Sequence, residues 1–196
     1  MAPRIHLVRH AQGLHNVSTE NTTIHDPILT TLGQQQCGEL QRKFPHHQGI
    51  ELIVSSPIKR TLYTALFSFQ DDIKNRGLKI IALPELQETS GLPCDTGSEP
   101  RELANMFRSD PIDFTLVLPG WNVKEGKWAP EKQAIAQRAQ EAREWLIQRP
   151  EKEIVVVTHG SYRSFDDTAL IAAIVVSCVM LLLPLPMSLR SLLYQL

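Results

Sequence analysis

The sequence predicts an α/β fold with three layers, α/β/α, around a mostly parallel central sheet. Short apolar segments rich in β-branched residues alternate along the chain with segments whose apolar residues recur at helical spacing. This alternation is typical of a parallel sheet that is covered by helices on both faces. The length of 196 residues, with 42% hydrophobic and 21% charged residues, fits one globular domain.

The predicted elements alternate in type for most of the chain. In chain order they are a strand at 5–8, a helix at 31–44, a strand ending at Ser55, a helix at 58–69, a strand at 79–83, a helix at 98–107, a helix at 131–149 and a strand at 154–157. A Pro/Gly-rich loop at 84–97 and an irregular stretch at 111–130 interrupt this order.

Apolar stripes and capping residues support the longer helices. The stripe of the first helix consists of Leu32, Cys37, Leu40 and Phe44, and that of the helix at 131–149 consists of Ile135, Ala139, Ala142 and Leu146. Ser56 is the predicted N-cap of the helix at 58–69, and Pro57 is its predicted first-turn proline. Trp121 and Trp128, within the irregular stretch, are expected to anchor packing.

Composition excludes several classes of protein. The net charge of −1 and the lack of a strong basic run argue against nucleic-acid binding. The three cysteines, Cys37, Cys94 and Cys178, are odd in number and widely spaced, which suits a reducing compartment and argues against a disulfide framework or a zinc ribbon. The apolar stretch near the N-terminus is too short for a secretory signal. A cytoplasmic location is therefore expected.

Charged and imidazole side chains follow the predicted strands where they end. Sites in open α/β sheets form at the carboxyl ends of the strands. Four side chains are thereby expected to converge: Arg9, His10, Arg60 and His159. Two guanidinium groups and two imidazoles would repel one another without an anion between them, and arginine suits bidentate phosphate binding. Because P-loop glycines are absent, side chains would hold the phosphate, and we predict a phosphoryl site.

Five segments in a fixed order carry a family resemblance. They are LVRHAQGLHN at 7–16, DPILTTLGQQQ at 26–36, SSPIKRTLYTA at 55–65, PELQE at 84–88 and VVVTHG at 155–160. Together they resemble the signature segments of the histidine phosphatase superfamily, the phosphoglycerate-mutase-like proteins. The resemblance covers roughly residues 4–160.

The resemblance implies a role for each matching residue. His10 would be the nucleophile that is phosphorylated on a ring nitrogen, and Asn16 would donate to the phosphate from the pocket wall. Glu88 would protonate the leaving alcohol and then activate water. The implied phosphate-binding set is Arg9, Asn16, Arg60 and His159. No metal or other cofactor is implied, because the arginines neutralise the phosphate charge.

Alternatives stay open for some of these residues. Glu85 competes with Glu88 as the acid, and spacing from Pro84 favours Glu88. His6 and His10 lie four apart on one strand face, but no third ligand follows at suitable spacing, so no metal site is predicted. His15 is a candidate pocket residue. Arg101 is interpreted as a surface charge, with contact to the substrate as the less favoured alternative.

The implied function is that of a metal-independent phosphatase acting on a small phosphomonoester. A phosphoglycerate-mutase-type phosphotransferase is the first alternative, and hydrolysis is favoured because long insertions like those of glycolytic mutases are absent. A non-catalytic phosphate-ester-binding protein with an altered C-terminus is the second. The expected partner is a small phosphorylated substrate, with no nucleic acid.

The sequence divides into a histidine-phosphatase-like part at 1–164 and a divergent apolar segment at 165–196. Residues 168–189 carry no charge, and Pro184 and Pro186 interrupt them. Three interpretations compete for this segment: a buried helix or strand that replaces the family's ending, a change of reading frame or splicing, and a membrane tail anchor. The prolines and β-branched residues favour a packed, atypical ending, so that deletion of 165–196 is expected to unfold the protein.

Overall fold

The protein forms one six-stranded sheet with helices on both faces. The computed structural model describes residues 2–160 and 176–178. The strands are β1 (Arg4–Arg9), β2 (Leu52–Ser55), β3 (Ile80–Ala82), β4 (Ile112–Asp113), β5 (Glu153–Thr158) and β6 (Val176–Cys178). Their order is β4-β3-β2-β5-β1-β6, and every neighbouring pair runs parallel. The predicted α/β/α fold with a mostly parallel sheet is confirmed.

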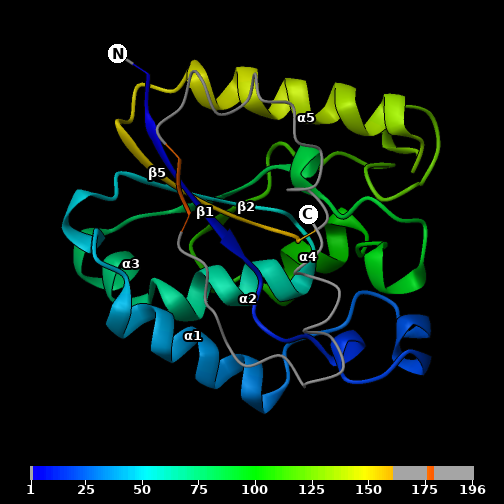
Figure 1. The fold of residues 1–196 in the computed structure, drawn as a ribbon, viewed down its shortest axis with the longest axis horizontal. Coiled ribbons are helices and arrows are strands. Elements are labelled where there is room, and N and C mark those ends of the chain that lie inside the picture. The colour runs from blue at the N-terminus through cyan, green and yellow to red at the C-terminus, as the bar shows by residue number, and fades with distance from the viewer. Residues whose placement is uncertain (1, 161–175, 179–196) are drawn as a thin grey trace, which may run out of the picture.

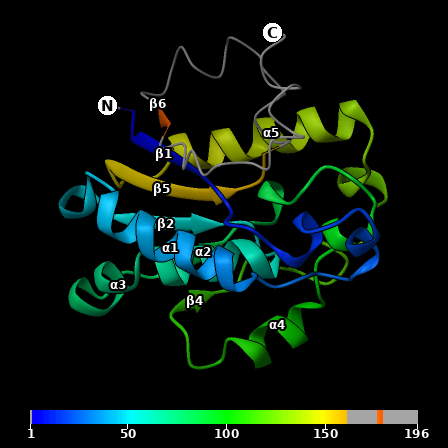
Figure 2. The same cartoon turned by 60° about the horizontal axis from the view of Figure 1, so that its bottom comes forward.

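Helices cover the two faces of the sheet unequally. The helices are α1 (Thr31–Lys43), α2 (Lys59–Ser68), α3 (Gln70–Arg76), α4 (Pro100–Met106) and α5 (Lys132–Ile147). Figure 1 shows α5 on one face, with α1 and α2 on the other. The turned view in Figure 2 separates α4 from the other helices, near the β4 edge. Leu103 and Phe107, at the end of α4, share a buried cluster with Leu62 of α2.

Each face of the sheet has its own hydrophobic core, because side chains alternate between the two faces along a strand. On β5, Ile154 and Val156 pack in the cluster that includes Leu146 of α5, whereas Val155 and Val157 pack in the cluster on the opposite face. Successive strand side chains point to opposite faces, so a strand buried on both sides becomes continuously apolar. Each fully buried aliphatic side chain stabilises the fold by about 1.5–3 kcal/mol. The core thus fixes β5 beside β1 and β2.

The predicted stripe of α1 is partly wrong. Leu32 is 47% exposed, and the helix instead buries Gly33 and Gln36 beside Cys37 and Leu40. A Cβ on Gly33 would lie 2.2 Å from the carbonyl oxygen of Gln12. Because α1 approaches the loop after β1 this closely, position 33 has room for glycine and not for a larger residue. The buried face of the helix is therefore rotated from the predicted apolar stripe.

The predicted stripe of α5 also includes a charged residue. Ile135, Ala142 and Leu146 are buried as predicted, but Ala139 is only half-buried and Arg138 is fully buried. One terminal nitrogen of Arg138 donates to the carbonyl of Gln87 over 3.3 Å. A polar contact, rather than apolar periodicity, therefore decides this part of the helix face.

The DPILTTLG segment joins three parts of the chain. The Asp26 carboxylate accepts hydrogen bonds from the backbone N–H groups of Lys59 (2.9 Å) and Ser98 (2.8 Å). Thr30 caps α1 by accepting from the N–H of Gly33 (3.0 Å). The segment thereby ties the loop after β1 to the start of α2 and to the loop after β3.

Short helical turns occupy the loops. The 3₁₀ helices are η1 (Leu14–Asn16), η2 (Glu20–Thr23), η3 (His47–Gly49), η4 (Pro84–Leu86), η5 (Pro93–Asp95) and η6 (Gly126–Trp128). Trp121 is 1% exposed, and its indole N–H donates to the carbonyl of Ser98 over 3.2 Å. The expectation that Trp121 anchors packing is confirmed.

Most of the divergent segment at 165–196 lies outside the described residues. The exception is β6, whose backbone pairs in parallel with β1, with Val176 opposite Ile5 and Cys178 opposite Leu7. Within the described ranges, 2–160 and 176–178, no helix combines the length and apolarity needed to span a bilayer. The proposed division of the chain at 164 stays a prediction.

Candidate active site

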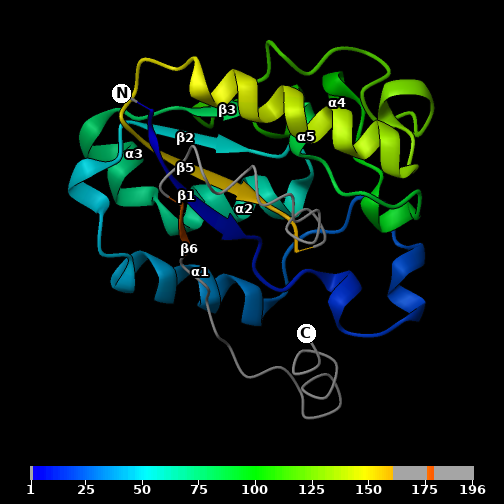
Figure 3. The ribbon, with the colours of Figure 1, turned by 45° about the horizontal axis from the view of Figure 1, so that its top comes forward.

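The predicted site residues come from three adjacent strands. His10 follows β1, His159 follows β5, and Arg60 lies in the first turn of α2 behind β2. In Figure 3 the carboxyl ends of β1, β2 and β5 point to the same side of the molecule, toward the short turns of the N-terminal segment. The rings of His10 and His159 stand 5.2 Å apart between centroids. The expected convergence at the strand ends is thus present in the fold.

Arg60 is the buried centre of the site. Its Nε donates to Nε2 of His10 over 3.2 Å, and Nη1 donates to the carbonyl of Cys94 over 2.6 Å. Its Nη2 donates to Oδ1 of Asp95 over 2.9 Å and also lies 3.2 Å from Nδ1 of His159. The side chain is fully buried, so Asp95 supplies the compensating charge.

Hydrogen bonds indicate which ring nitrogen carries the proton in each of the two imidazoles next to Arg60. Nδ1 of His10 lies 2.7 Å from the carbonyl oxygen of Ala11. A carbonyl only accepts, so this nitrogen carries the proton, and Nε2 keeps its lone pair toward Arg60. Burial, and then the charges of Arg60 and Arg9, lower the pKa of His10 well below its usual value. His10 is therefore neutral near pH 7 with Nε2 unprotonated.

His159 is oriented by a residue that the sequence placed elsewhere. Its Nδ1 accepts from Arg60, and its Nε2 donates to the hydroxyl of Ser56 over 3.0 Å. Burial, followed by the charge of Arg60, lowers the pKa of His159 well below the usual value. The N-cap prediction for Ser56 is wrong, because Ile58 occupies the N-cap of α2 and Pro57 also precedes the helix. The Ser56 hydroxyl instead faces the site.

Of the two glutamates that competed for the role of the acid, Glu88 lies at the site and Glu85 does not. Its Oε1 accepts from the backbone N–H (2.9 Å) and the hydroxyl (3.3 Å) of Thr89. Its Oε2 lies 3.7 Å from Nδ1 of His159. Glu85 pairs with Lys127 at 2.7 Å. Since Oε1 accepts both hydrogen bonds from Thr89, Oε2 is the oxygen that lies toward His159.

The remaining predicted residues lie at the edges of the site. Arg9 ends β1, and burial lowers its pKa, with smaller contributions from the charges of Glu88 and Arg60. A Cβ on Gly160 would lie 3.1 Å from Nε of Arg9. Asn16 is exposed, and its Oδ1 accepts from the N–H of Gly13 over 3.0 Å, so only its amide nitrogen could donate to a ligand. Its role in phosphate binding stays a prediction.

His15 lies next to His10. Its ring lies 5.5 Å from that of His10 between centroids. Burial, and then the charge of Arg60, lower the pKa of His15 to about 4, so this imidazole is neutral as well. That His15 lines a substrate pocket stays a prediction.

Two residues of the site were missed from the sequence. Asp95 binds Arg60, and Nζ of Lys124 donates to Oε1 of Gln87 (2.8 Å) and to the carbonyl of Glu88 (3.1 Å). Both belong to loops that carry no recognisable motif. A buried arginine needs a nearby anion, and that requirement is the one signal that could have directed attention to an acidic residue in the 84–97 loop.

His6 has a structural contact away from the site. Its Nε2 lies 2.8 Å from Oε1 of Glu153, and its ring stacks on that of His46 with centroids 4.9 Å apart. In the part of the chain that the structure describes, no three or more His, Cys, Asp or Glu side chains are grouped as metal ligands would be.

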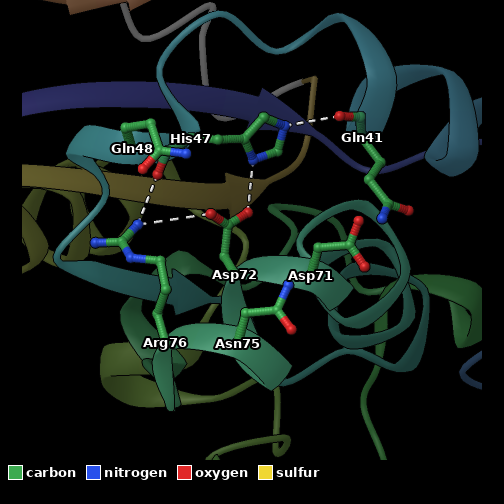
Figure 4. Close-up of a pocket in the computed structure, with 7 residues that line it drawn as sticks. All are labelled: Gln41, His47, Gln48, Asp71, Asp72, Asn75 and Arg76. Atoms are coloured by element: carbon green, nitrogen blue, oxygen red, sulfur yellow. Dashed lines mark hydrogen bonds and ion pairs between the residues drawn. The ribbon is translucent and has the colours of Figure 1, made fainter.

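A separate polar depression lies at the opposite ends of the strands (Figure 4). It is lined by Gln41, His47, Gln48, Asp71, Asp72, Asn75 and Arg76. His47 bridges Oδ2 of Asp72 (2.5 Å) and the carbonyl of Gln41 (2.7 Å), and Arg76 donates to the carbonyl of His47 (2.6 Å). These contacts join η3 to α1 and α3, and we interpret the depression as a structural junction.

Comparison with known proteins assigns the chain to a family. The model of the histidine phosphatase superfamily (branch 1) matches residues 5–164. The chain belongs to this superfamily. A Schizosaccharomyces pombe protein named "Probable phosphatase" is 32% identical over 160 residues, covering 80% of this chain and 73% of its own length. A phosphoglycerate mutase-like protein of Arabidopsis thaliana is 30% identical over 197 residues, covering 81% of this chain and 71% of its own length.

Solved structures share the fold of this superfamily member. The ecdysone phosphate phosphatase of Bombyx mori, solved with tungstate, has a TM-score of 0.55 and 17% identity, covering 80% of this chain and 72% of its own. A phosphoglycerate mutase of Bacillus anthracis has a TM-score of 0.53 and 16% identity, covering 82% and 76%. At these identities the likeness establishes the fold alone.

The buried neutral histidines predict acid sensitivity of the fold. His10 and His159 have lowered pKa values when folded, whereas in the unfolded chain they titrate near 6.5. Below pH 6.5 the unfolded state therefore binds more protons, and each histidine lowers the free energy of unfolding by about 1.4 kcal/mol per pH unit. Urea unfolding in phosphate-free buffer from pH 7.5 to 5.5 measures this loss.

The control for this prediction is the double variant His10→Asn/His159→Gln. It lacks both imidazoles, so its unfolding free energy is expected to depend less steeply on pH than that of the wild type. Equal pH slopes for the two proteins would mean that the imidazoles are not held neutral.

Proposed function

We propose that this protein hydrolyses a small phosphomonoester through a phosphohistidine intermediate on His10, without requiring a metal ion. The observation that carries the proposal is the placement of His10, whose Nδ1 lies 2.7 Å from the carbonyl oxygen of Ala11 and whose Nε2 accepts from Nε of Arg60 over 3.2 Å. A lone pair held next to fixed cationic donors is the arrangement needed for attack on a phosphate dianion. The phosphatase name of the Schizosaccharomyces pombe relative supports the same reaction class.

In the first step, the substrate phosphate binds between Arg9, Arg60 and His159, whose Nδ1 takes up a proton as the dianion binds and donates it to a phosphate oxygen. The Nε donor of Arg60 turns from His10 to a phosphate oxygen and frees the nucleophile. Nε2 of His10 then forms a bond to phosphorus as the bond to the ester oxygen breaks, and Oε2 of Glu88 gives its proton to the leaving alcohol. The cations stabilise charge on the equatorial oxygens, which is the principal demand of phosphoryl transfer.

In the second step, water replaces the alcohol. The Glu88 carboxylate takes a proton from the water, whose oxygen bonds to phosphorus as the phosphorus–nitrogen bond breaks. His10 leaves as neutral imidazole, inorganic phosphate forms, and Glu88 is again protonated. The cycle therefore balances without a redox partner or another cofactor.

A panel of phosphate esters tests this proposal. Purified protein is expected to release inorganic phosphate from at least one small phosphomonoester, with a rate unchanged by a chelator and inhibited by tungstate or vanadate. Guanidinium groups supply the positive charge, so removal of divalent ions is expected to change nothing. No phosphate release across the panel, or full loss of activity on chelation, would contradict the proposal.

A further inference from the structure

The segment that carries Glu88 is held by contacts from several elements. The hydroxyl of Thr158, next to His159, donates to the carbonyl of Leu86 over 3.1 Å. The amide nitrogen of Gln87 donates to the carbonyl of Trp121 over 2.7 Å. Lys124 then donates to the Gln87 side chain and to the Glu88 carbonyl. Of these contacts, the one from Lys124 reaches the backbone of Glu88 itself.

We infer that Lys124 is a positioning residue for Glu88, holding its backbone so that Oε2 meets the leaving oxygen; this inference rests on the proposed function. Lys124 links two loops, because it belongs to the loop before α5 and Glu88 belongs to the loop after β3. The lysine side chain reaches across with two hydrogen bonds of 2.8 and 3.1 Å. Loss of both bonds frees the backbone of Glu88, whereas Thr158 and Trp121 still hold Leu86 and Gln87 before it.

The surroundings of Lys124 fit a placed residue rather than a surface charge. The charges of Arg138 of α5, Asp95 of η5, Glu88 and Arg60 of α2 all act on the pKa of this lysine. Burial and the charge of Arg138 lower the pKa of Lys124 to about 8. A protein that keeps an ammonium ion in such surroundings loses solvation, and the hydrogen bonds to Gln87 and Glu88 offset that loss.

Substrates with different leaving groups distinguish positioning of the acid by Lys124 from a general effect on the site. p-Nitrophenolate departs without a proton, so formation of phosphohistidine from p-nitrophenyl phosphate needs no acid. An alkyl phosphate such as glycerol 2-phosphate needs a proton from Glu88 as its bond breaks. If Lys124 positions the acid, its removal lowers the rate of hydrolysis of the alkyl phosphate. The rate of the pre-steady-state burst from p-nitrophenyl phosphate is unchanged.

Lys124→Met removes both hydrogen bonds at nearly constant volume. We expect kcat for the alkyl phosphate to fall about 30-fold or more, within the range of general acid catalysis, with KM changed less than about 3-fold. The rate of the p-nitrophenolate burst is expected to stay within about 3-fold of wild type. Lys124→Arg, which retains the cation and its donors, is expected to restore most of the lost rate.

The matched control is Lys127→Met, three residues along the same loop. Lys127 pairs with Glu85 (2.7 Å) and Glu141 (2.6 Å), outside the site, so its loss is expected to leave both substrates unchanged. Thermal unfolding of each variant separates loss of fold from loss of rate, and Lys124→Arg keeps the test open where Lys124→Met does not fold.

Three results decide the outcome. Selective loss on the alkyl phosphate with rescue by arginine supports the inference. Equal losses on both substrates, a change confined to KM, or no change overturns the role of Lys124 and leaves the proposed function in place. A wild-type protein that gives no burst and no phosphate release overturns the proposed function, and the role of Lys124 falls with it.

Discussion

His10→Asn is expected to lower kcat for phosphate release by about 10⁴-fold or more. Asparagine retains a polar side chain at this buried position but has no lone pair able to form a stable bond to phosphorus. Steady-state assays with the best substrate of the panel measure the effect, and calorimetric binding of tungstate measures whether the cationic pocket persists. Tungstate affinity is expected to stay within about tenfold, because Arg9, Arg60 and His159 remain.

His6→Asn is the matched control for this variant. His6 is a fully buried histidine of β1, four residues before the buried His10, and its contact is with Glu153, away from the site. It is expected to lose stability and to keep kcat within a few-fold. Comparable losses in kcat for the two variants would contradict a nucleophilic role for His10.

Arg60→Met is expected to cost both activity and stability. The substitution leaves the Asp95 carboxylate, 12% exposed, without its guanidinium partner. Breaking a buried ion pair in this way lowers the free energy of unfolding by about 3–5 kcal/mol. It also removes the donor that orients His10 and His159, so phosphate release is expected to fall by about 10³-fold. Denaturant unfolding and steady-state assays measure the two effects.

The partner substitution Asp95→Asn separates stability from catalysis. In the double variant Arg60→Met/Asp95→Asn the unpaired charge is gone, so part of the stability is expected to return while activity does not. A double-mutant cycle with additive effects would contradict the coupling of the two side chains. Arg60→Lys is expected to remain impaired, since a lysine ammonium does not reproduce the planar set of donors to His10, Cys94, Asp95 and His159.

The strands and the polar residues that end them could be predicted from the sequence because their signals are local. A β-branched run such as residues 154–157 reports a buried strand, and the histidine after it reports the strand end. Because parallel strands present their carboxyl ends at one edge, residues far apart in sequence, such as His10 and His159, could be placed together.

The loop contributions could not be predicted because they depend on tertiary contacts. Nothing local distinguishes Asp95 or Lys124 from other loop residues, and their importance follows from what they reach, namely Arg60 and the Glu88 segment. Ser56 was misplaced for the same reason, since a serine before a helix resembles an N-cap until His159 is seen to bind it. Arg138 likewise interrupts an apolar stripe to meet Gln87.

Direct detection of the phosphorylated enzyme tests the central claim most sharply. Glu88→Gln, incubated with p-nitrophenyl phosphate, forms the intermediate without needing the acid and hydrolyses it slowly for lack of the base, so the phosphoryl group accumulates. Denaturation at alkaline pH, where phosphohistidine survives, followed by mass spectrometry of peptides locates the group. We predict up to one phosphoryl group per chain, on His10, and none in His10→Asn. A phosphoryl group on any other residue, or none in Glu88→Gln while wild-type protein releases phosphate, would contradict the account.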